Sequence, residues 1–184
     1  PFNEILFQKS INNIKSRGIF KSVSSDIKIS KIDNQKKIID IMVEESPTGE
    51  IFAGAGTGTS GATISGGIQE KNYLGKGIKL KTNLLVSEDQ IKGKFQVENP
   101  NFKNTDRTLN TIIESTSSDF LSTGGFKTSR TGFAIGTGFE QYSDLFVNLD
   151  ISAYYEKLET SSSASAHKKK QEGDYFENLL SYGL

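Results

Sequence analysis

Residues 54–61 read GAGTGTSG and are followed by ATISGG at residues 62–67. The part from Gly56 to Gly61 satisfies G-x-G-x-x-G, the pattern of a dinucleotide-binding loop. Such a loop needs a helix that starts at its last glycine and an acidic residue about 20 positions further on. Here more glycines follow without helical periodicity, and the expected acidic position is Ile78, between Gly77 and Lys79. The sequence therefore predicts no nucleotide cofactor.

The same glycines fit a β-hairpin whose first strand has small side chains. In this strand Ile51, Ala53, Ala55 and Thr57 would lie on one face, and Phe52, Gly54 and Gly56 on the other. Glycine inside a strand weakens pairing and lets another backbone approach closely. Backbone hydrogen bonds would therefore hold most of this pairing, and the strand's neighbour across an opening should be exchangeable. The predicted strand-pairing site is Ile51, Phe52, Ala53, Gly54, Ala55, Gly56 and Thr57.

From Glu50 onward the hydrophobic pattern has a period of two, which gives each strand one apolar and one polar face. The clearest alternation lies in KGIKLKTNLLVS (76–87), IKGKFQVEN (91–99), GFAIGTGFE (132–140) and DLFVNLDISAYYEK (144–157). The short connections NYLGKG (72–77), PNFKNTDR (100–107) and QYSD (141–144) alternate with longer polar stretches at 116–130 and 158–174. Short turns at one end and long loops at the other are typical of transmembrane β-barrels. A soluble β-sandwich can show the same alternation.

Residues 1–47 follow a different pattern. Phe7, Ile11 and Ile14 have helical spacing, with Asn3 as the expected N-cap and Gly18 as the expected stop. Two strand-like runs follow at 20–30 and 36–45, joined by the polar turn KIDNQK at 31–36. The sequence thus predicts a small helix–strand–strand unit that ends near Pro47.

Composition excludes several classes of function. The 184 residues carry 22 basic and 22 acidic side chains. The net charge is therefore zero and gives no support for a nucleic-acid partner. Without cysteine there is neither a disulfide nor a thiolate metal site. The single histidine, His167, is expected in a solvated loop beside Lys168–Lys170, whose role stays open. No group of residues suggests chemical catalysis or a metal, so the chain is not expected to be an enzyme.

The order of several motifs resembles the BamA family of outer-membrane assembly proteins. The stretch VEESPTGEIFAGAGTGTSGATISGGIQEKNYLGKG (43–77) contains a Thr-Gly junction, a glycine-rich strand and an N-aromatic-L-G-x-G turn, and VENPNF (97–102) supplies an N-P-x-F turn. RGIFKSV (17–23) is similar to the helix end and strand start of that family's last POTRA domain. The resemblance covers nearly the whole chain.

The resemblance implies a mainly β fold. Residues 1–47 would be the C-terminal part of the last POTRA domain, a partial α+β domain in the periplasm. Residues 48–184 would be the N-terminal half of an outer-membrane antiparallel β-barrel, roughly eight of about sixteen strands. Since the last segment stops within an alternating pattern, we expect the chain to be a fragment.

The function implied is folding and insertion of β-barrel proteins into the outer membrane of a Gram-negative bacterium. The first barrel strand would pair weakly with the last and would template strands of nascent outer-membrane proteins. Other expected partners are outer-membrane lipids and, through the POTRA part, lipoproteins of the Bam type. Three alternatives stay open: a two-partner-secretion or TamA-like translocation pore, a passive channel, and a soluble β-sandwich that binds a ligand.

Overall fold

The computed structural model describes residues 2–30, 36–58 and 61–184. By its internal contacts the chain divides into two units, Pro1–Thr48 and Gly49–Leu184. The elements of the first unit are α1 (Glu4–Ser16), β1 (Phe20–Ile29) and β2 (Lys37–Glu45). No helix among the described residues has the length and apolar character needed to cross a membrane.

The first unit is built around helix α1. The Asn3 side chain accepts hydrogen bonds from the backbone N–H groups of Ile5 (3.0 Å) and Leu6 (3.1 Å), as expected of an N-cap. Gly18 follows the helix with φ +65°, a conformation that glycine adopts without steric cost. Phe7 and Ile11 are buried, so both predicted helix ends and its apolar stripe are confirmed.

The two strands of this unit pair antiparallel, with Ile27 opposite Ile39 and Val23 opposite Val43. Lys28 Nζ lies 3.0 Å from both Asp26 and Asp40, and its hydrogen bond to the Asp40 carboxylate raises the pKa of the ammonium group. The predicted turn KIDNQK falls mostly on residues 31–35, which lie outside the described residues.

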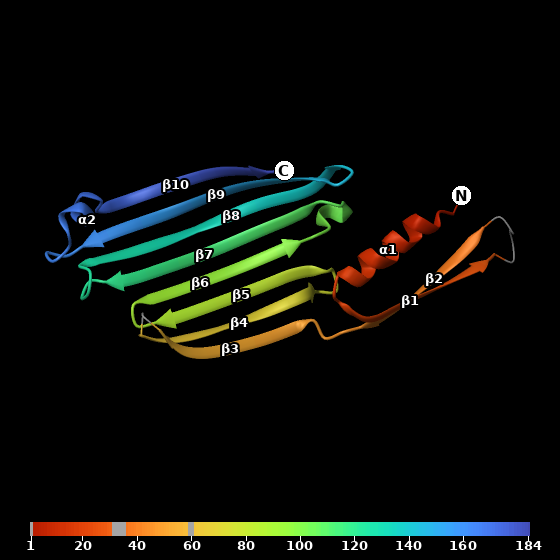
Figure 1. Cartoon of the computed structure of the whole chain (residues 1–184), viewed down its shortest axis with the longest axis horizontal. Coiled ribbons are helices and arrows are strands. Elements are labelled where there is room, and N and C mark those ends of the chain that lie inside the picture. Colours follow the sequence, from red (N-terminus) through yellow and green to blue (C-terminus); the bar gives the residue numbers. More distant parts are fainter. Residues whose placement is uncertain (1, 31–35, 59–60) are drawn as a thin grey trace. The chain divides into compact units, whose positions relative to one another are not determined.

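The second unit is one eight-stranded antiparallel sheet in sequence order, β3 to β10 (Figure 1). Its strands are β3 (Gly49–Gly58), β4 (Gly61–Tyr73), β5 (Ile78–Ser87), β6 (Gln90–Asn99), β7 (Thr108–Phe120), β8 (Phe126–Tyr142), β9 (Leu145–Thr160) and β10 (Gly173–Gly183). A 3-10 turn η1 (Phe102–Asn104) precedes β7, and a short helix α2 (Ala166–Lys170) precedes β10. Within the described residues β3 and β10 do not pair, so the sheet stays open.

The two faces of this sheet differ in chemistry. Residues that oppose one another across the strands share a face. One face is mostly polar; the other is apolar over the middle of the strands, although at one end of β7–β9 it carries Asp119, Lys127, Lys157 and Glu159. On the apolar face large side chains are strongly exposed, for example Ile64 (66%), Ile113 (54%) and Ile151 (60%). A sheet that exposes its apolar side has no hydrophobic core on that side, and it fits an apolar solvent better than water.

Two connections were predicted wrongly. The stretch 116–130 was expected to be a long loop, but Thr116–Phe120 completes β7, Phe126–Arg130 begins β8, and only 121–125 connect them. Likewise, Leu158–Thr160 belong to β9, and His167 lies on α2 rather than in an irregular loop. These segments are rich in Ser, Thr and Lys, but in the sheet their polar side chains pair across strands, as in the ion pair between Asp119 and Lys127 (3.3 Å).

The free edges lead to a prediction about the isolated chain. β3 and β10 both present unpaired backbone groups, and the apolar face is exposed, so the 184-residue polypeptide should aggregate in buffer without detergent. Size-exclusion chromatography with light scattering tests this, with detergent micelles as the comparison. A monodisperse monomer in plain buffer would contradict the assignment of the apolar face to a non-aqueous environment.

Candidate functional site: the edge strand

β3 is the strand with the fewest contacts to hold it in the sheet. Among the described residues it pairs only with β4, from Gly49 opposite Glu70 to Gly58 opposite Gly61, without a bulge. All ten of its residues are exposed. An edge strand of this kind presents a row of unpaired N–H and C=O groups that another strand can use.

The predicted pairing residues all lie in β3, on the faces expected from alternation. Ile51, Ala53, Ala55 and Thr57 are on the apolar face, since Ile51 opposes Ile68 and Ala55 opposes Ile64. Phe52, Gly54 and Gly56 are on the polar face.

Most of β3 has too little side chain to anchor it. A Cβ built on Gly56 or Gly58 would have no heavy atom within 4 Å, so the polar face beside these residues is open. On the apolar face only methyl-sized groups follow Ile51. Ala53, Ala55 and Thr57 have few side-chain atoms to pack against β4. Backbone hydrogen bonds to β4 therefore hold most of this strand in place.

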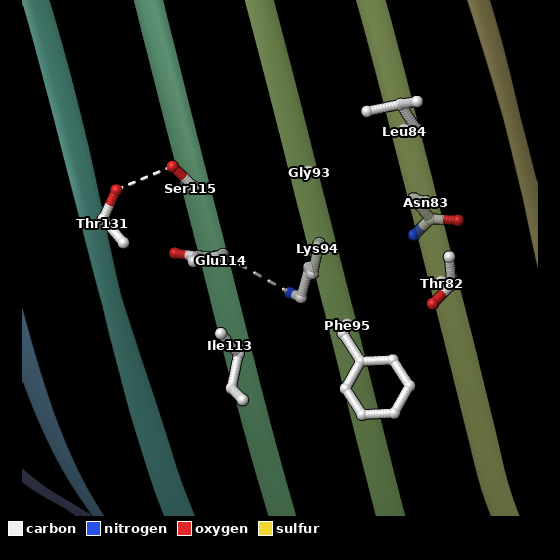
Figure 2. A pocket seen from close by; sticks show the side chains of 10 residues that line it. All are labelled: Thr82, Asn83, Leu84, Gly93, Lys94, Phe95, Ile113, Glu114, Ser115 and Thr131. Carbon is white, nitrogen blue, oxygen red and sulfur yellow. Dashed lines mark hydrogen bonds and ion pairs between the residues drawn. The ribbon is translucent and has the colours of Figure 1, made fainter.

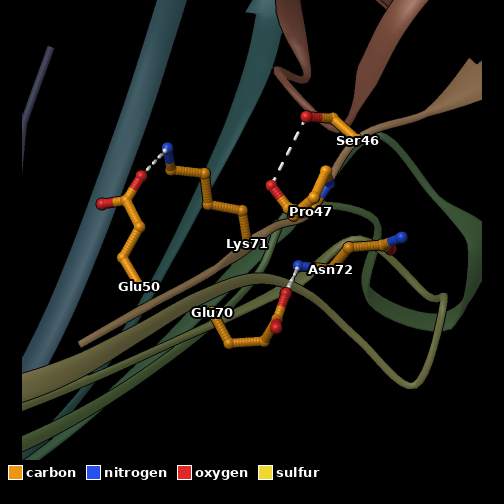
Figure 3. Close-up of polar contacts among 6 residues, drawn as sticks. All are labelled: Ser46, Pro47, Glu50, Glu70, Lys71 and Asn72. Atoms are coloured by element: carbon orange, nitrogen blue, oxygen red, sulfur yellow. Dashed lines mark hydrogen bonds and ion pairs between the residues drawn. The ribbon is translucent and has the colours of Figure 1, made fainter.

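Polar contacts fix the sheet at the start of β3 (Figure 3). Lys71 Nζ lies 3.2 Å from Glu50 Oε1 and joins β4 to β3, while Glu70 accepts a hydrogen bond of 2.6 Å from the Asn72 N–H. Asn72 Oδ1 in turn accepts from the Gly77 N–H at 2.7 Å and closes the turn between β4 and β5. The N-aromatic-L-G-x-G motif thus has a local structural reason, because Leu74, Gly75 and Gly77 all have positive φ in this turn.

One row of residues crosses the polar face from edge to edge. Consecutive members oppose each other in neighbouring strands: Phe52, Gly67, Asn83, Lys94, Glu114, Gly132, Tyr154 and Glu177. In two places an aromatic ring lies over a glycine. A Cβ on Gly67 would come 2.5 Å from Phe52 Cζ, and a Cβ on Gly132 would come 2.5 Å from Tyr154 Cδ1.

Near the β10 end of this row, one arginine contacts side chains of two other strands, a contact that the sequence did not reveal. The Arg130 guanidinium lies 3.7 Å from the centroid of the Tyr154 ring and donates to Glu177 Oε2 at 2.8 Å. It therefore connects β8 to β10 across β9. No single motif signals this contact; only the pairing register brings the three side chains together.

Charge on the polar face is divided between two halves of the sheet. β4–β6 carry mostly lysines, namely Lys71, Lys79, Lys81, Lys92 and Lys94, with Glu98. β7–β10 carry mostly carboxylates, namely Glu114, Asp150, Glu156 and Glu177, with Arg130. Lys71, Lys79 and Lys81 line a recess of about 270 Å³, where Lys79 pairs with Glu98 at 2.8 Å.

The apolar face has a shallow depression of about 420 Å³ (Figure 2). Leu84, Phe95 and Ile113 surround it, and Gly93 forms part of its floor. The lining is almost entirely apolar and open to the outside, so it suits hydrocarbon rather than a polar ligand.

The described residues hold no candidate metal centre. No group of three or more His, Asp or Glu residues there is arranged to hold a metal ion. His167, on α2, is exposed next to Lys168, whose ammonium group lies 4.5 Å from the centroid of the Phe126 ring.

Comparison with solved structures finds the same fold. The crystal structure of BamA from Haemophilus ducreyi lacking POTRA domains 1–3 matches 96% of this chain with a TM-score of 0.71 and 20% sequence identity. The match covers 36% of that chain, so this chain spans about a third of its length. The antiparallel sheet is therefore BamA-like, a part of a β-barrel.

Comparison with protein families identifies most of the second unit independently. The Omp85 superfamily domain matches residues 72–184, from the turn before β5 to the C-terminal residue. Proteins of this superfamily lie in the outer membrane of Gram-negative bacteria. Because the matched region is more than half of the sequence, the chain belongs to the Omp85 superfamily.

Proposed function

We propose that this chain is part of an assembly factor that folds and inserts β-barrel proteins into the outer membrane. The observation that carries the proposal is β3, an edge strand paired on one side only and almost without anchoring side chains. An incoming strand would add to its free edge by β-augmentation, in which main-chain hydrogen bonds give the affinity. Membership of the Omp85 superfamily supports this role.

In this proposal the apolar face is toward lipid and the polar face is toward the barrel lumen. The connections after β4, β6 and β8 would then lie at the periplasmic end, as the BamA-like order of the turn motifs implies. Unit Pro1–Thr48 would be the C-terminal part of the last POTRA domain, in the periplasm, and would contact lipoproteins of the Bam type. Its helix–strand–strand order supports this assignment. The match to the BamA structure supports it too, because it covers 96% of this chain and therefore most of this unit.

Weak anchoring is what makes the proposed mechanism reversible. Each strand exchange breaks backbone hydrogen bonds on one side of β3 and forms them with another strand, so the net free-energy change is small. Large interlocking side chains would stabilise one of the two pairings by several kcal/mol, so that the strands would no longer exchange. The protein would need no chemical catalysis, cofactor or metal, because the work is done by exchanging one ladder of hydrogen bonds for another.

A translocation pore of the same superfamily, of the two-partner-secretion or TamA-like type, is the second candidate. The charged polar face favours it specifically, since rows of lysines and carboxylates would suit a water-filled passage. The two functions differ in the number of client proteins: an assembly factor acts on many barrels, and a dedicated pore acts on one passenger.

Site-specific crosslinking tests the pairing role. In the full-length protein carrying this chain, cysteine at Ala53 or Ala55 should form a disulfide with a cysteine in the terminal strand of an assembling barrel substrate. Ala153→Cys is the matched control, because it places the same side chain on the same face but in β9, which is paired on both sides. Absence of a crosslink to β3 at every substrate register would refute the pairing role.

Bulky residues at the glycines should separate the two candidates. Gly54→Val and Gly56→Val together should strengthen β3 pairing by about 1–2 kcal/mol, since strand propensities differ by about 1 kcal/mol per site. Assembly of many outer-membrane proteins, followed by their heat-modifiable mobility, should then slow about 5- to 30-fold. Gly93→Val is the control. A Cβ there, like one on Gly56, meets no atom within 4 Å, and one on Gly54 meets only Ser65 Oγ at 3.5 Å; Gly93, however, lies on the apolar face of interior strand β6. Loss of a single passenger, with other barrels unaffected, would favour the pore.

A further inference from the structure

We infer that the ring of Phe52, seated on Gly67, sets the register of β3 against β4. Through β3 the ring also sets the register at which a substrate strand pairs. This second effect rests on the proposed function. The starting point is the composition of the strand. Register is weakly specified in glycine-rich strands, because small residues fit on either face. After Glu50, the polar face of β3 offers only Phe52, Gly54, Gly56 and Gly58, so Phe52 is its one large side chain.

Because Gly67 has no side chain, it leaves the space that this ring occupies. It lies directly opposite Phe52, and an added Cβ would be 2.5 Å from Cζ and 2.9 Å from Cε1 of the ring. The same Cβ would also collide with the backbone oxygen of Thr82 on β5. No side chain fits at residue 67 unless both the ring and a neighbouring strand move.

Shifted pairing registers of β3 against β4 do not provide the same contact for the ring. A shift of two residues, about 6.8 Å along the strand, would place Phe52 opposite Ser65 or Gln69. Both of these residues have side chains on the polar face, so the ring could not lie flat on the backbone there. A shift of one residue would move Phe52 to the other face of the sheet.

The apolar face cannot supply the same specification. Ile51 opposes Ile68 there, but the two side chains are 83% and 54% exposed, and in the proposed orientation lipid surrounds them. Lipid chains are as apolar as isoleucine, so contact between the two residues gains no hydrophobic free energy over contact with lipid. On the water-filled side, by contrast, contact with β4 covers part of Phe52, which stays 42% exposed, and removes that part of its apolar surface from water. The ion pair of Glu50 and Lys71 is exposed and adds little.

Cysteine pairs read the register directly. In the full-length protein, Ala55→Cys should crosslink to Ile64→Cys, its opposite residue, whereas a slipped strand would crosslink instead to Ala62→Cys or Gly66→Cys. Phe52→Ala should raise the ratio of slipped to native crosslinks about five- to tenfold, since much of the ring's burial is lost. Phe52→Tyr keeps the ring and should retain the native ratio. Phe52→Leu is a milder variant, for use if the alanine protein does not accumulate, and should give an intermediate ratio.

Tyr154→Ala provides a matched control. It removes the other ring that lies over a glycine in the same row, but from β9, which is held on both sides by β8 and β10. Its strand should keep its register, measured with cysteines at the opposed residues Phe133 and Ala153. Slippage in this variant equal to that in Phe52→Ala would overturn the claim that the edge strand depends specially on its ring.

The substrate crosslink provides the second readout. With cysteine at Ala53, Phe52→Ala should move part of the crosslinks by two residues along the substrate strand, which a general loss of stability would not do. An unchanged β3–β4 register in Phe52→Ala and Phe52→Leu overturns the inference. A slipped β3 with an unmoved substrate crosslink overturns the transmission to the substrate. If the parent protein gives no substrate crosslink at all, the proposed function fails, and the β3–β4 cysteine pairs still decide the role of Phe52.

Discussion

Each backbone N–H and C=O group of a sheet in a membrane has to find a hydrogen-bond partner within the protein, because the hydrocarbon offers none. In this chain the seven strand pairings from β3 to β10 meet that requirement throughout the interior of the sheet. The requirement is unmet only at the two outer strands. An open edge next to lipid is costly, so β3 has to be paired with something at nearly all times. In the proposed function, small differences between competing strands would decide the identity of that partner.

The side chains of β3 fit this competition. A strand with Leu, Val or Ile at most alternate positions, such as β5, gains packing contacts that favour one neighbour over others. β3 replaces these residues by Ala53, Ala55 and glycines, so neither the native neighbour nor a foreign strand is favoured by side-chain packing. One aromatic ring, Phe52, lies on Gly67 and is set apart from this pattern. The small residues of β3 thus make its edge unselective, whereas Phe52 fixes its position against β4.

Much of this architecture follows from alternation in the sequence. Strands β5 and β9 were predicted because apolar and polar residues alternate over ten or more positions. The glycine-rich stretch was correctly separated from a nucleotide loop, because a strand rather than a helix follows it. The end of β7 and the start of β8 were missed because Ser, Thr and Lys are also typical of loops. Only cross-strand partners such as Asp119 and Lys127 distinguish a strand from a loop there. Contacts that depend on register, namely Phe52 on Gly67 and Arg130 between Tyr154 and Glu177, require knowledge of which residues oppose each other.

The lysines of β4–β6 and the carboxylates of β7–β10 give the polar face an electric dipole along its surface. The net charge of the whole chain is zero, so this asymmetry is invisible in its composition. A peptide with separated charges that lies against this wall would be rotated until its acidic part faces the lysines. At physiological ionic strength the field decays over about 8 Å, so it acts only on segments already inside. This division of charge therefore favours the orientation of such a segment rather than its recruitment from a distance.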